Sequence, residues 1–294
     1  MTALRWRLCG IVLLLCGLAV AARAEIRAEI RAVDDEGATL VLRAPAQRIV
    51  SIAPHLTELL FAAGAGPRVV AVSAYSDYPD AARRLPQVGD AVLLDLERIV
   101  ALKPDLVLVW ANGSSPQQLQ RLRAAGLPVF SSAARGLPHI AATLRTLGRL
   151  AGTEAVAEAR AQAFEATLAD LRSRYAGRKP LRVFHQIWHA PLMTVNGQHP
   201  VSEALALCGA VNVFAGQPQL VPQVSAESVV AARPDAIVTG RAAGAPDDGL
   251  DGWRRLPSMK TVALISVNPD LLHRATDRMA DGARELCEKL DGLR

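Results

Sequence analysis

The chain has 294 residues, of which 51% are hydrophobic and 21% are charged, and this composition excludes a chain that is mainly disordered. The formal charge of +5 would suit a nucleic-acid-binding protein, but three arginines lie in the first 24 residues, which contain no acid. Without that segment 30 basic residues face 28 acidic ones, so no nucleic-acid partner is expected.

Residues 1–24 are predicted to be a secretory signal peptide. Arg5 and Arg7 precede an apolar run, 8–20, and a small-x-small cleavage site follows at 22–24. A membrane anchor is the alternative, but it needs about 20 apolar residues, and this run is shorter. We therefore expect an exported, soluble mature chain in the periplasm.

After a short lead-in, 25–46, β-branched runs alternate with helical patterns, as they do in parallel sheets with crossover helices. No G-x-G-x-x-G follows the first predicted strand, so the phosphate cradle of a nucleotide site is missing. The predicted first lobe, 47–151, has strands at 48–52, 69–73, 105–110 and 127–131 and helices at 57–63, 96–102 and 116–125.

A long helix is predicted between two lobes. Residues 153–175 contain no proline or glycine, and apolar side chains recur every three or four positions along one stripe. A helix of this length spans about 34 Å, enough to run along both lobes as a stiff spine. We expect the bridge to occupy 152–176 and the second lobe 177–294, with a first strand at 181–187 and a terminal helical pattern at 271–290.

An internal duplication indicates that the two lobes are similar. Segment 96–107 recurs as 226–237, at an offset of 130 residues. The pair Thr57-Glu58 recurs in the same order as Ser202-Glu203, and Thr57 and Ser202 are each expected to cap a helix. The alternative is that all helix-to-strand joints look alike, but two ordered pairs favour two related Rossmann-like lobes.

Only two cysteines lie beyond the predicted signal peptide, Cys208 and Cys287. In an oxidising compartment they are expected to form a disulfide, with two buried free thiols as the alternative. Neither a C-x-x-C motif nor a zinc-ribbon spacing occurs.

Three segments, 51–58, 75–79 and 96–105, resemble the vitamin B12 (cobalamin) periplasmic binding proteins of ABC importers. The likeness extends over nearly all of 47–291. It implies an α/β fold of class III, with two Rossmann-like lobes on one long helix. It also implies a non-enzymatic, monomeric receptor that binds a corrinoid and delivers it to the two-fold membrane permease of an ABC importer.

The candidate ligand-binding residues follow strand ends, where open α/β sheets bind ligands. A corrin is a broad macrocycle with polar amide arms, so its receptor needs aromatic faces and a few hydrogen-bonding groups. By resemblance, Tyr75 and Trp110 match cleft positions of the receptors, and Asp270 matches a second-lobe acid near the ligand. Trp188 follows the first strand of the second lobe. For each aromatic residue the alternative is core filling.

The sequence departs from the cobalamin receptors at Ala91 and Val221, where those proteins carry tryptophan. Trp188 and Trp253 are the candidates to replace them. A ferric siderophore or haem binding protein of the same class therefore stays open as an alternative, with haem held through His55 or Tyr75.

The histidines do not predict a metal site. His55 could reach the ligand from the loop after the first strand. His185 and His189 are four residues apart in a predicted strand, and so would stand about 13 Å apart. We expect no bound metal and no resident cofactor, the corrinoid being the transported ligand.

Glu97 and Glu227 occupy equivalent places in the repeat, one in each lobe. The resemblance implies that both dock onto arginines of the two-fold permease, and the alternative is a solvated charge at a helix end. An exported hydrolase is the remaining functional alternative, disfavoured because neither G-x-S-x-G nor H-E-x-x-H occurs.

Overall fold

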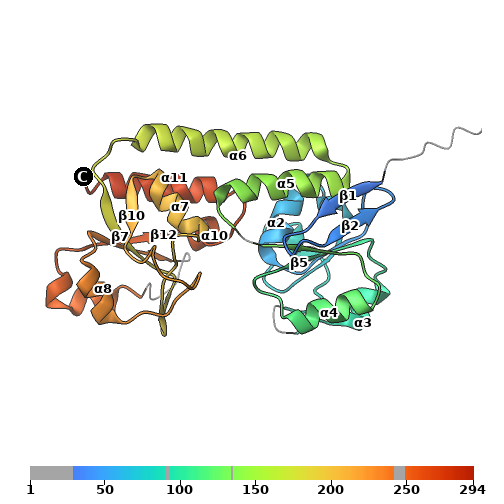
Figure 1. The fold of residues 1–294 in the computed structure, drawn as a ribbon, viewed down its shortest axis with the longest axis horizontal. Coiled ribbons are helices and arrows are strands. Elements are labelled where there is room, and N and C mark those ends of the chain that lie inside the picture. The colour runs from blue at the N-terminus through green and yellow to red at the C-terminus, as the bar shows by residue number, and fades with distance from the viewer. Residues whose placement is uncertain (1–28, 91–92, 134, 242–248) are drawn as a thin grey trace, which may run out of the picture.

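A computed structural model describes residues 29–90, 93–133, 135–241 and 249–294; the predicted signal peptide and Ala91 lie outside these ranges. Two lobes hang side by side beneath one long helix, α6 (Glu154–Tyr175) (Figure 1). Each lobe contains a four-stranded, wholly parallel sheet, with strand orders β4-β3-β5-β6 and β10-β7-β11-β12. The predicted fold class is confirmed.

Short helices connect the strands of both lobes. The first lobe comprises the antiparallel hairpin β1 (Ile30–Val33) and β2 (Thr39–Leu42), then β3 (Ile49–Ser51), α2 (Pro54–Ala62), β4 (Val69–Val72), α3 (Leu96–Ala101), β5 (Leu106–Trp110), α4 (Pro116–Ala124), β6 (Val129–Ser132) and α5 (Leu137–Ala151). The second comprises β7 (Leu181–Gln186), the hairpin β8 (Trp188–His189) and β9 (Leu192–Met193), α7 (Pro200–Leu207), β10 (Ala210–Asn212), α8 (Ala226–Ala232), β11 (Ala236–Gly240), α9 (Asp251–Arg255), β12 (Ala263–Val267), α10 (Pro269–Leu272) and α11 (Met279–Asp291).

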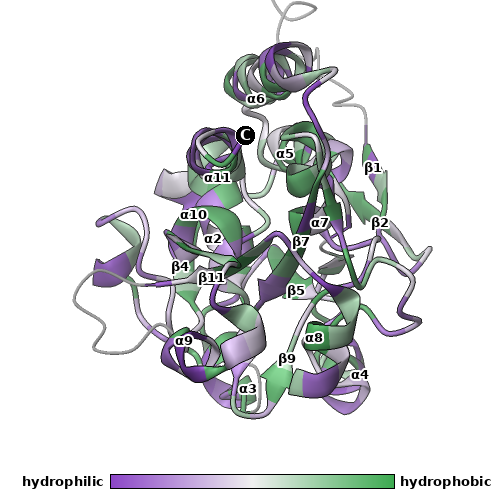
Figure 2. Ribbon diagram, turned by 90° about the vertical axis from the view of Figure 1, so that its left-hand side faces the viewer, coloured by the Kyte–Doolittle hydropathy of each residue, from purple (hydrophilic) through white to green (hydrophobic). Residues whose placement is uncertain are grey.

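Helix α6 is held by the apolar stripe that its sequence predicts. The buried residues of the stripe belong to one hydrophobic cluster that also contains side chains of α2, α5, α7 and α11. Two smaller clusters pack on the other side of the sheets, one in each lobe. Figure 2 shows hydrophobic residues concentrated in the strands and in α5, with hydrophilic residues along α4. One continuous core therefore joins the lobes along α6.

The duplicated segments fold alike. Lys103 and Arg233, which are equivalent in the repeat, both adopt left-handed backbone, with φ of 48° and 46°. Each follows a short helix and precedes a proline that opens the next strand segment. Asp105 accepts a hydrogen bond from the backbone N–H of Arg48, and Asp235 accepts one from Arg182 in the same way. The two joints are thus built by equivalent contacts.

Two helix starts differ from the expected ones. Helix α2 begins at Pro54 instead of residue 57, because proline is favoured at the first helical position. Thr57 and Ser202 do not cap helices: both are buried inside them, and Thr57 Oγ1 donates to Ser51 Oγ at 2.9 Å. His199 caps α7 instead, accepting from Val201 N.

The C-terminal helical pattern is interrupted. Instead of one helix from residue 271, the chain forms α10, which ends at Leu272, and α11, which starts at Met279. The segment between them, 273–278, carries two arginines that contact the first lobe. The break therefore turns this segment toward the boundary between the lobes.

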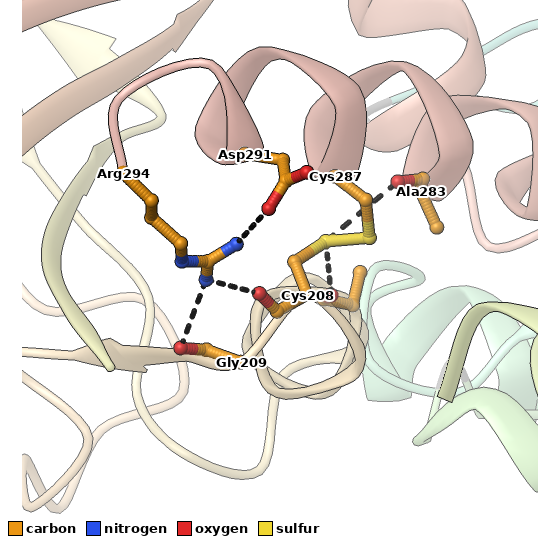
Figure 3. The surroundings of a disulfide bond; sticks show 7 residues. Cys208, Gly209, Ala283, Cys287, Asp291 and Arg294 are labelled. Atoms are coloured by element: carbon orange, nitrogen blue, oxygen red, sulfur yellow. Dashed lines mark hydrogen bonds and ion pairs between the residues drawn. A yellow bond between two sulfur atoms is a disulfide. The ribbon is translucent and has the colours of Figure 1, made fainter. Parts of the chain in front are cut away.

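The predicted disulfide joins Cys208, at the end of α7, to Cys287 in α11 (Figure 3). The carboxyl-terminal residue adds to this junction, since Arg294 Nη2 donates to the carbonyl oxygens of Cys208 and Gly209 at 2.6 and 3.2 Å. None of the helices among the described residues is both long and apolar enough to cross a membrane.

Candidate functional site

Trp110 and His55 meet at one edge of the first-lobe sheet. Trp110 ends β5, and His55 lies in the first turn of α2, which follows the neighbouring strand β3, so both stand at the carboxyl edge of a parallel sheet. Their ring centroids are 5.4 Å apart and edge-to-face. Gly113 packs so closely that a Cβ there would lie 1.8 Å from Trp110 Cε3, which fixes the indole in place. The indole Nε1 is buried and has no hydrogen-bond partner.

The sequence suggested that His55 lies in a loop, but the structure places it in the first turn of a helix. Burial lowers its pKa to about 4, and the positive charge of Arg274 adds to the shift. The imidazole is therefore neutral at neutral pH, with one nitrogen able to donate and one able to accept a hydrogen bond.

Tyr75 stands on a turn after β4, with 76% of the residue exposed and a left-handed φ of 64°. This backbone conformation is unusual for a bulky residue. The turn is held from below by buried hydroxyls: Ser76 Oγ lies 3.1 Å from Thr57 Oγ1 and 3.3 Å from Ser73 Oγ. The fold therefore holds the Tyr75 ring out in solvent at the edge that Trp110 also occupies.

Arg274 connects the two lobes at this edge. Its Nη1 donates to Asp77 Oδ1 at 2.6 Å and to Glu58 Oε1 at 2.8 Å, both in the first lobe. Its Nη2 lies 3.4 Å from Asp270 Oδ1 on its own lobe. The hydrogen bond from Arg274 lowers the pKa of Asp77, which keeps that carboxylate ionised. Asp270 is thereby brought close to the first-lobe group.

Sequence reasoning missed Arg274, because its first-lobe partners lie 197 and 216 residues away along the chain. Of the predicted site residues, the structure places Trp110 against His55 and Asp270 against Arg274, and the charge of Arg274 acts on His55. Tyr75 stands at the same edge of the first-lobe sheet, and within the described ranges no hydrogen bond or ion pair joins it to this arginine.

Trp188 lies on the second lobe and is 58% exposed. The β8–β9 hairpin holds it, with the indole Nε1 donating to Ala190 O at 2.9 Å and the ring stacked on His189. A pocket of about 500 Å³ lies beside this hairpin and is lined in part by His189 and Leu192. Among the contacts of the described residues, none joins Trp188 to the group around Arg274.

Of the two tryptophans considered as replacements, Trp253 is buried in the second-lobe core. It is 5% exposed, packs edge-to-face on Phe184 and donates from Nε1 to Gln186 Oε1 at 2.7 Å. Val221, the described position that lacks tryptophan, is half-buried. Only Trp188 therefore offers an exposed indole from the second lobe.

The second-lobe histidines make a pair that the sequence did not predict. His185, on β7, places Nε2 3.0 Å from Nε2 of His273, at the end of α10. Burial lowers the pKa of His185 well below its usual value and that of His273 to about 4. Within the described ranges, no group of three or more histidine, cysteine or acidic side chains is placed to hold a metal ion.

Glu97 and Glu227 occupy equivalent first-turn positions of α3 and α8, and both are exposed. Asp95 and Ser225 cap these helices by accepting from the backbone N–H three residues ahead. Figure 1 shows α3 and α8 at the ends of the lobes farthest from α6. The two acids therefore lie on the same side of the molecule, one at the tip of each lobe.

Comparisons with known proteins place these features in a family. Residues 49–261 match a family described as periplasmic binding protein. A vitamin B12-binding protein of Vibrio cholerae serotype O1 is 37% identical over 247 residues, which cover 84% of this chain and 90% of the relative. The crystal structure of the periplasmic vitamin B12 binding protein of Vibrio cholerae superposes with a TM-score of 0.77 at 37% identity, covering 85% of this chain and 98% of that one. A periplasmic heme-binding protein from Roseiflexus gives a TM-score of 0.71 at 25% identity, covering 85% and 100%.

Proposed function

Because this chain belongs to the periplasmic binding protein family, we propose that it captures cobalamin or a related corrinoid between its lobes and delivers it to an ABC importer. The observation that carries the proposal is the 37% identity over 84% of the chain to a protein named for vitamin B12 binding. The heme-binding structure shares the fold at only 25% identity, so heme is the second candidate.

The geometry supports a flat ligand with a polar periphery. Trp110 and Tyr75 offer aromatic surface from the first lobe, and Trp188 offers it from the second. His55, which lies beside Trp110, and Asp270, which lies beside Arg274, are hydrogen-bonding groups suited to amide arms. In this proposal the corrinoid is the cargo, the protein is a monomeric receptor and not an enzyme, and it needs no resident cofactor.

The ligand is tested by titrating the chain from residue 25 onward with cyanocobalamin, haemin and a ferric hydroxamate siderophore. Tryptophan fluorescence and calorimetry should report saturable binding of cyanocobalamin with one site per chain. Haemin binding through Tyr75 or His55, together with no response to cyanocobalamin, would overturn the corrinoid proposal in favour of the second candidate. Tyr75→Phe then separates the two ligands, because it keeps the aromatic face and removes the hydroxyl that could bind iron.

Glu97 and Glu227 are proposed to dock onto basic residues of a two-fold permease, which their equivalent exposed positions support. Reversing both charges with Glu97→Arg and Glu227→Arg should abolish uptake and leave the affinity for cyanocobalamin unchanged. The control is Glu154→Arg, which changes an exposed first-turn acid on α6, on the opposite side of the lobes. Persisting uptake in the double variant would refute the docking role.

A further inference from the structure

The acids of the second repeated pair each reach into the opposite lobe. Glu58, on α2 of the first lobe, accepts from Arg274 Nη1 at 2.8 Å and from Arg278 Nη1 at 3.2 Å. Glu203, on α7 of the second lobe, accepts from the backbone N–H of Leu137 at 2.7 Å. The sequence showed these acids as a repeat, and the proposed function gives them no role.

The two contacts end at equivalent places. Leu137 is the first residue of α5, the last helix of the first lobe, and Arg278 immediately precedes α11, the last helix of the second lobe. Figure 1 shows α5 and α11 beneath α6, one in each lobe, and both pack against α6. Each lobe therefore sends one glutamate to the amino-terminal end of the other lobe's last helix.

The Glu203 contact depends on a glycine. Gly136 caps α5 without a side chain, and a Cβ at this position would lie 1.9 Å from Glu203 Oε1. Glu203 thus supplies from the other lobe the carboxylate that stabilises the positive end of a helix. A side chain at position 136 would force this carboxylate to move.

The Glu58 contact is a buried ion-pair network. The residue is 2% exposed, and a carboxylate so placed is stable only where cations compensate it. Burial raises the pKa of Glu58, while the two arginines oppose that shift. Arg278 also lies over the ring of Tyr78, 3.7 Å from its centroid, and the neighbouring Asp277 pairs with Arg160 of α6.

The disulfide ties together the second-lobe ends of both contacts. Cys208 follows Glu203 by five residues on α7, and Cys287 follows Arg278 by nine on α11 (Figure 3). Neither helix can move far without the other. In the first lobe, α2 and α5 pack directly against each other. We call the two contacts struts: the Glu58 strut joins α2 to the segment before α11, and the Glu203 strut joins α7 to the start of α5. In each lobe the two struts therefore end on helices that are held together, α2 with α5 and α7 with α11.

We propose that Glu58 and Glu203 are paired positioning residues that fix the angle between the lobes, and so hold the two halves of the ligand site at a set separation. The inference goes beyond the proposed function, because the angle is a property of the chain without ligand. Two contacts that run in opposite directions between the lobes restrain twisting as well as opening.

The test measures lobe separation in the full mature chain without ligand. Spin labels at Gln120→Cys and Ala231→Cys, exposed on α4 and α8, report the distance between the lobe tips by double electron–electron resonance. The parent should give a narrow distribution. Combining Glu58→Gln with Glu203→Ala should broaden it at least twofold, whereas Glu203→Gln alone should keep it narrow, because the amide oxygen can still accept from Leu137 N.

Gly136→Ala breaks one strut without changing any charge. Its backbone φ lies outside the left-handed region, so alanine is allowed there, but its Cβ displaces the Glu203 carboxylate. The distribution should broaden, because the contact between Glu203 and Leu137 N is lost. Gly216→Ala is the matched control, since a Cβ there meets nothing within 4 Å, and it should behave as the parent.

An unchanged distance distribution in Gly136→Ala and in the Glu58→Gln, Glu203→Ala double variant would overturn the inference. If the double variant does not fold, Gly136→Ala decides the outcome by itself. Faster dissociation of cyanocobalamin from the broadened variants, by about tenfold, supports the positioning role. Failure of the parent to bind cyanocobalamin overturns the corrinoid proposal alone, because the distance measurement needs no ligand.

Discussion

The two lobes have the same strand order, yet they differ where equivalent strands end. In the first lobe β5 ends in Trp110, and in the second lobe the equivalent residue of β11 is Gly240. His273 packs so closely against that glycine that a Cβ there would lie 2.6 Å from His273 Cε1. One lobe therefore presents an indole where the other presents an imidazole over a glycine.

The neighbouring strands differ in the same way. Ser51 pairs with β5 as His185 pairs with β11, so the two residues are equivalent. Ser51 accepts a hydrogen bond from Thr57, whereas His185 faces His273. The positions that build the joints are shared, as at Asp105 and its counterpart, while the positions at the carboxyl ends of the strands have diverged. The duplicated frame thus carries two chemically different edges.

The disulfide gives the largest expected difference in stability between the lobes, since both of its cysteines lie in the second lobe. The bridge closes a loop of 79 residues, for which the chain-entropy model gives about 4 to 5 kcal/mol. Cys208→Ser with Cys287→Ser should lower the unfolding free energy of the second lobe by about that amount. Urea unfolding measures it, followed by the fluorescence of Trp253 in a Trp110→Phe, Trp188→Phe background, with Trp110 kept as the reporter of the first lobe in a matched background. Dithiothreitol should reproduce the loss in the parent but not in the double variant. Equal loss in both lobes would show that they unfold as one unit.

Acid is expected to give the next largest difference in stability between the lobes. Burial lowers the pKa of three second-lobe histidines, to about 4 for His199 and His273 and well below its usual value for His185. In the first lobe, burial lowers the pKa of His55 to about 4. Unfolded histidine has a pKa near 6.5, so the unfolded chain binds more protons as pH falls from about 6.5 to 4. Stability is therefore greatest above pH 6.5 and is lost toward pH 4, first in the second lobe.

The acid prediction is checked with His199→Asn, which keeps a side chain able to cap α7 and removes one titrating group. The slope of unfolding free energy against pH should fall by up to about 1.4 kcal/mol per pH unit between pH 6.5 and 4. His189→Asn, at an exposed position, is the matched control. An unaltered slope in His199→Asn would mean that the titration responsible lies elsewhere.

The aromatic residues of the two lobes are expected to contribute unequally to ligand affinity. Trp110 is fixed by Gly113 and His55, whereas Trp188 is largely exposed. Trp110→Ala should weaken cyanocobalamin binding by about 1 to 3 kcal/mol, by analogy with base stacking, and Trp188→Ala by less. Calorimetry measures both, with Trp110→Phe as the conservative variant. A larger loss for Trp188→Ala would place the main binding face on the second lobe.

What could be predicted from the sequence follows from the range of the interactions. The stripe of α6 and the repeated joints depend on residues close in the chain, and the structure has both. Arg274 and the His185–His273 pair depend on contacts between residues up to 216 positions apart, for which one sequence carries no local signal.

The wrong expectations have local causes. Thr57 was expected to cap a helix, because its residue type favours a cap, but Pro54 starts the helix three residues earlier. The apolar periodicity predicts a continuous helix across 273–278, but this segment leaves the helix and forms ion pairs with the other lobe. Trp253 was considered for the ligand site, but its side chain fills the second-lobe core.

The smallest expected effect tests whether the two joints are energetically equivalent. Lys103 and Arg233 hold left-handed backbone, which costs an L-residue about 1 to 2 kcal/mol and glycine nothing comparable. Part of that gain is offset, because glycine loses more backbone entropy on folding. Lys103→Gly and Arg233→Gly should each stabilise the chain by about 0.5 kcal/mol, and additively, because they lie in separate lobes. The corresponding alanine variants should give no gain. Urea unfolding measures the changes, and a gain in one lobe only would show that matching backbone angles conceal different local packing.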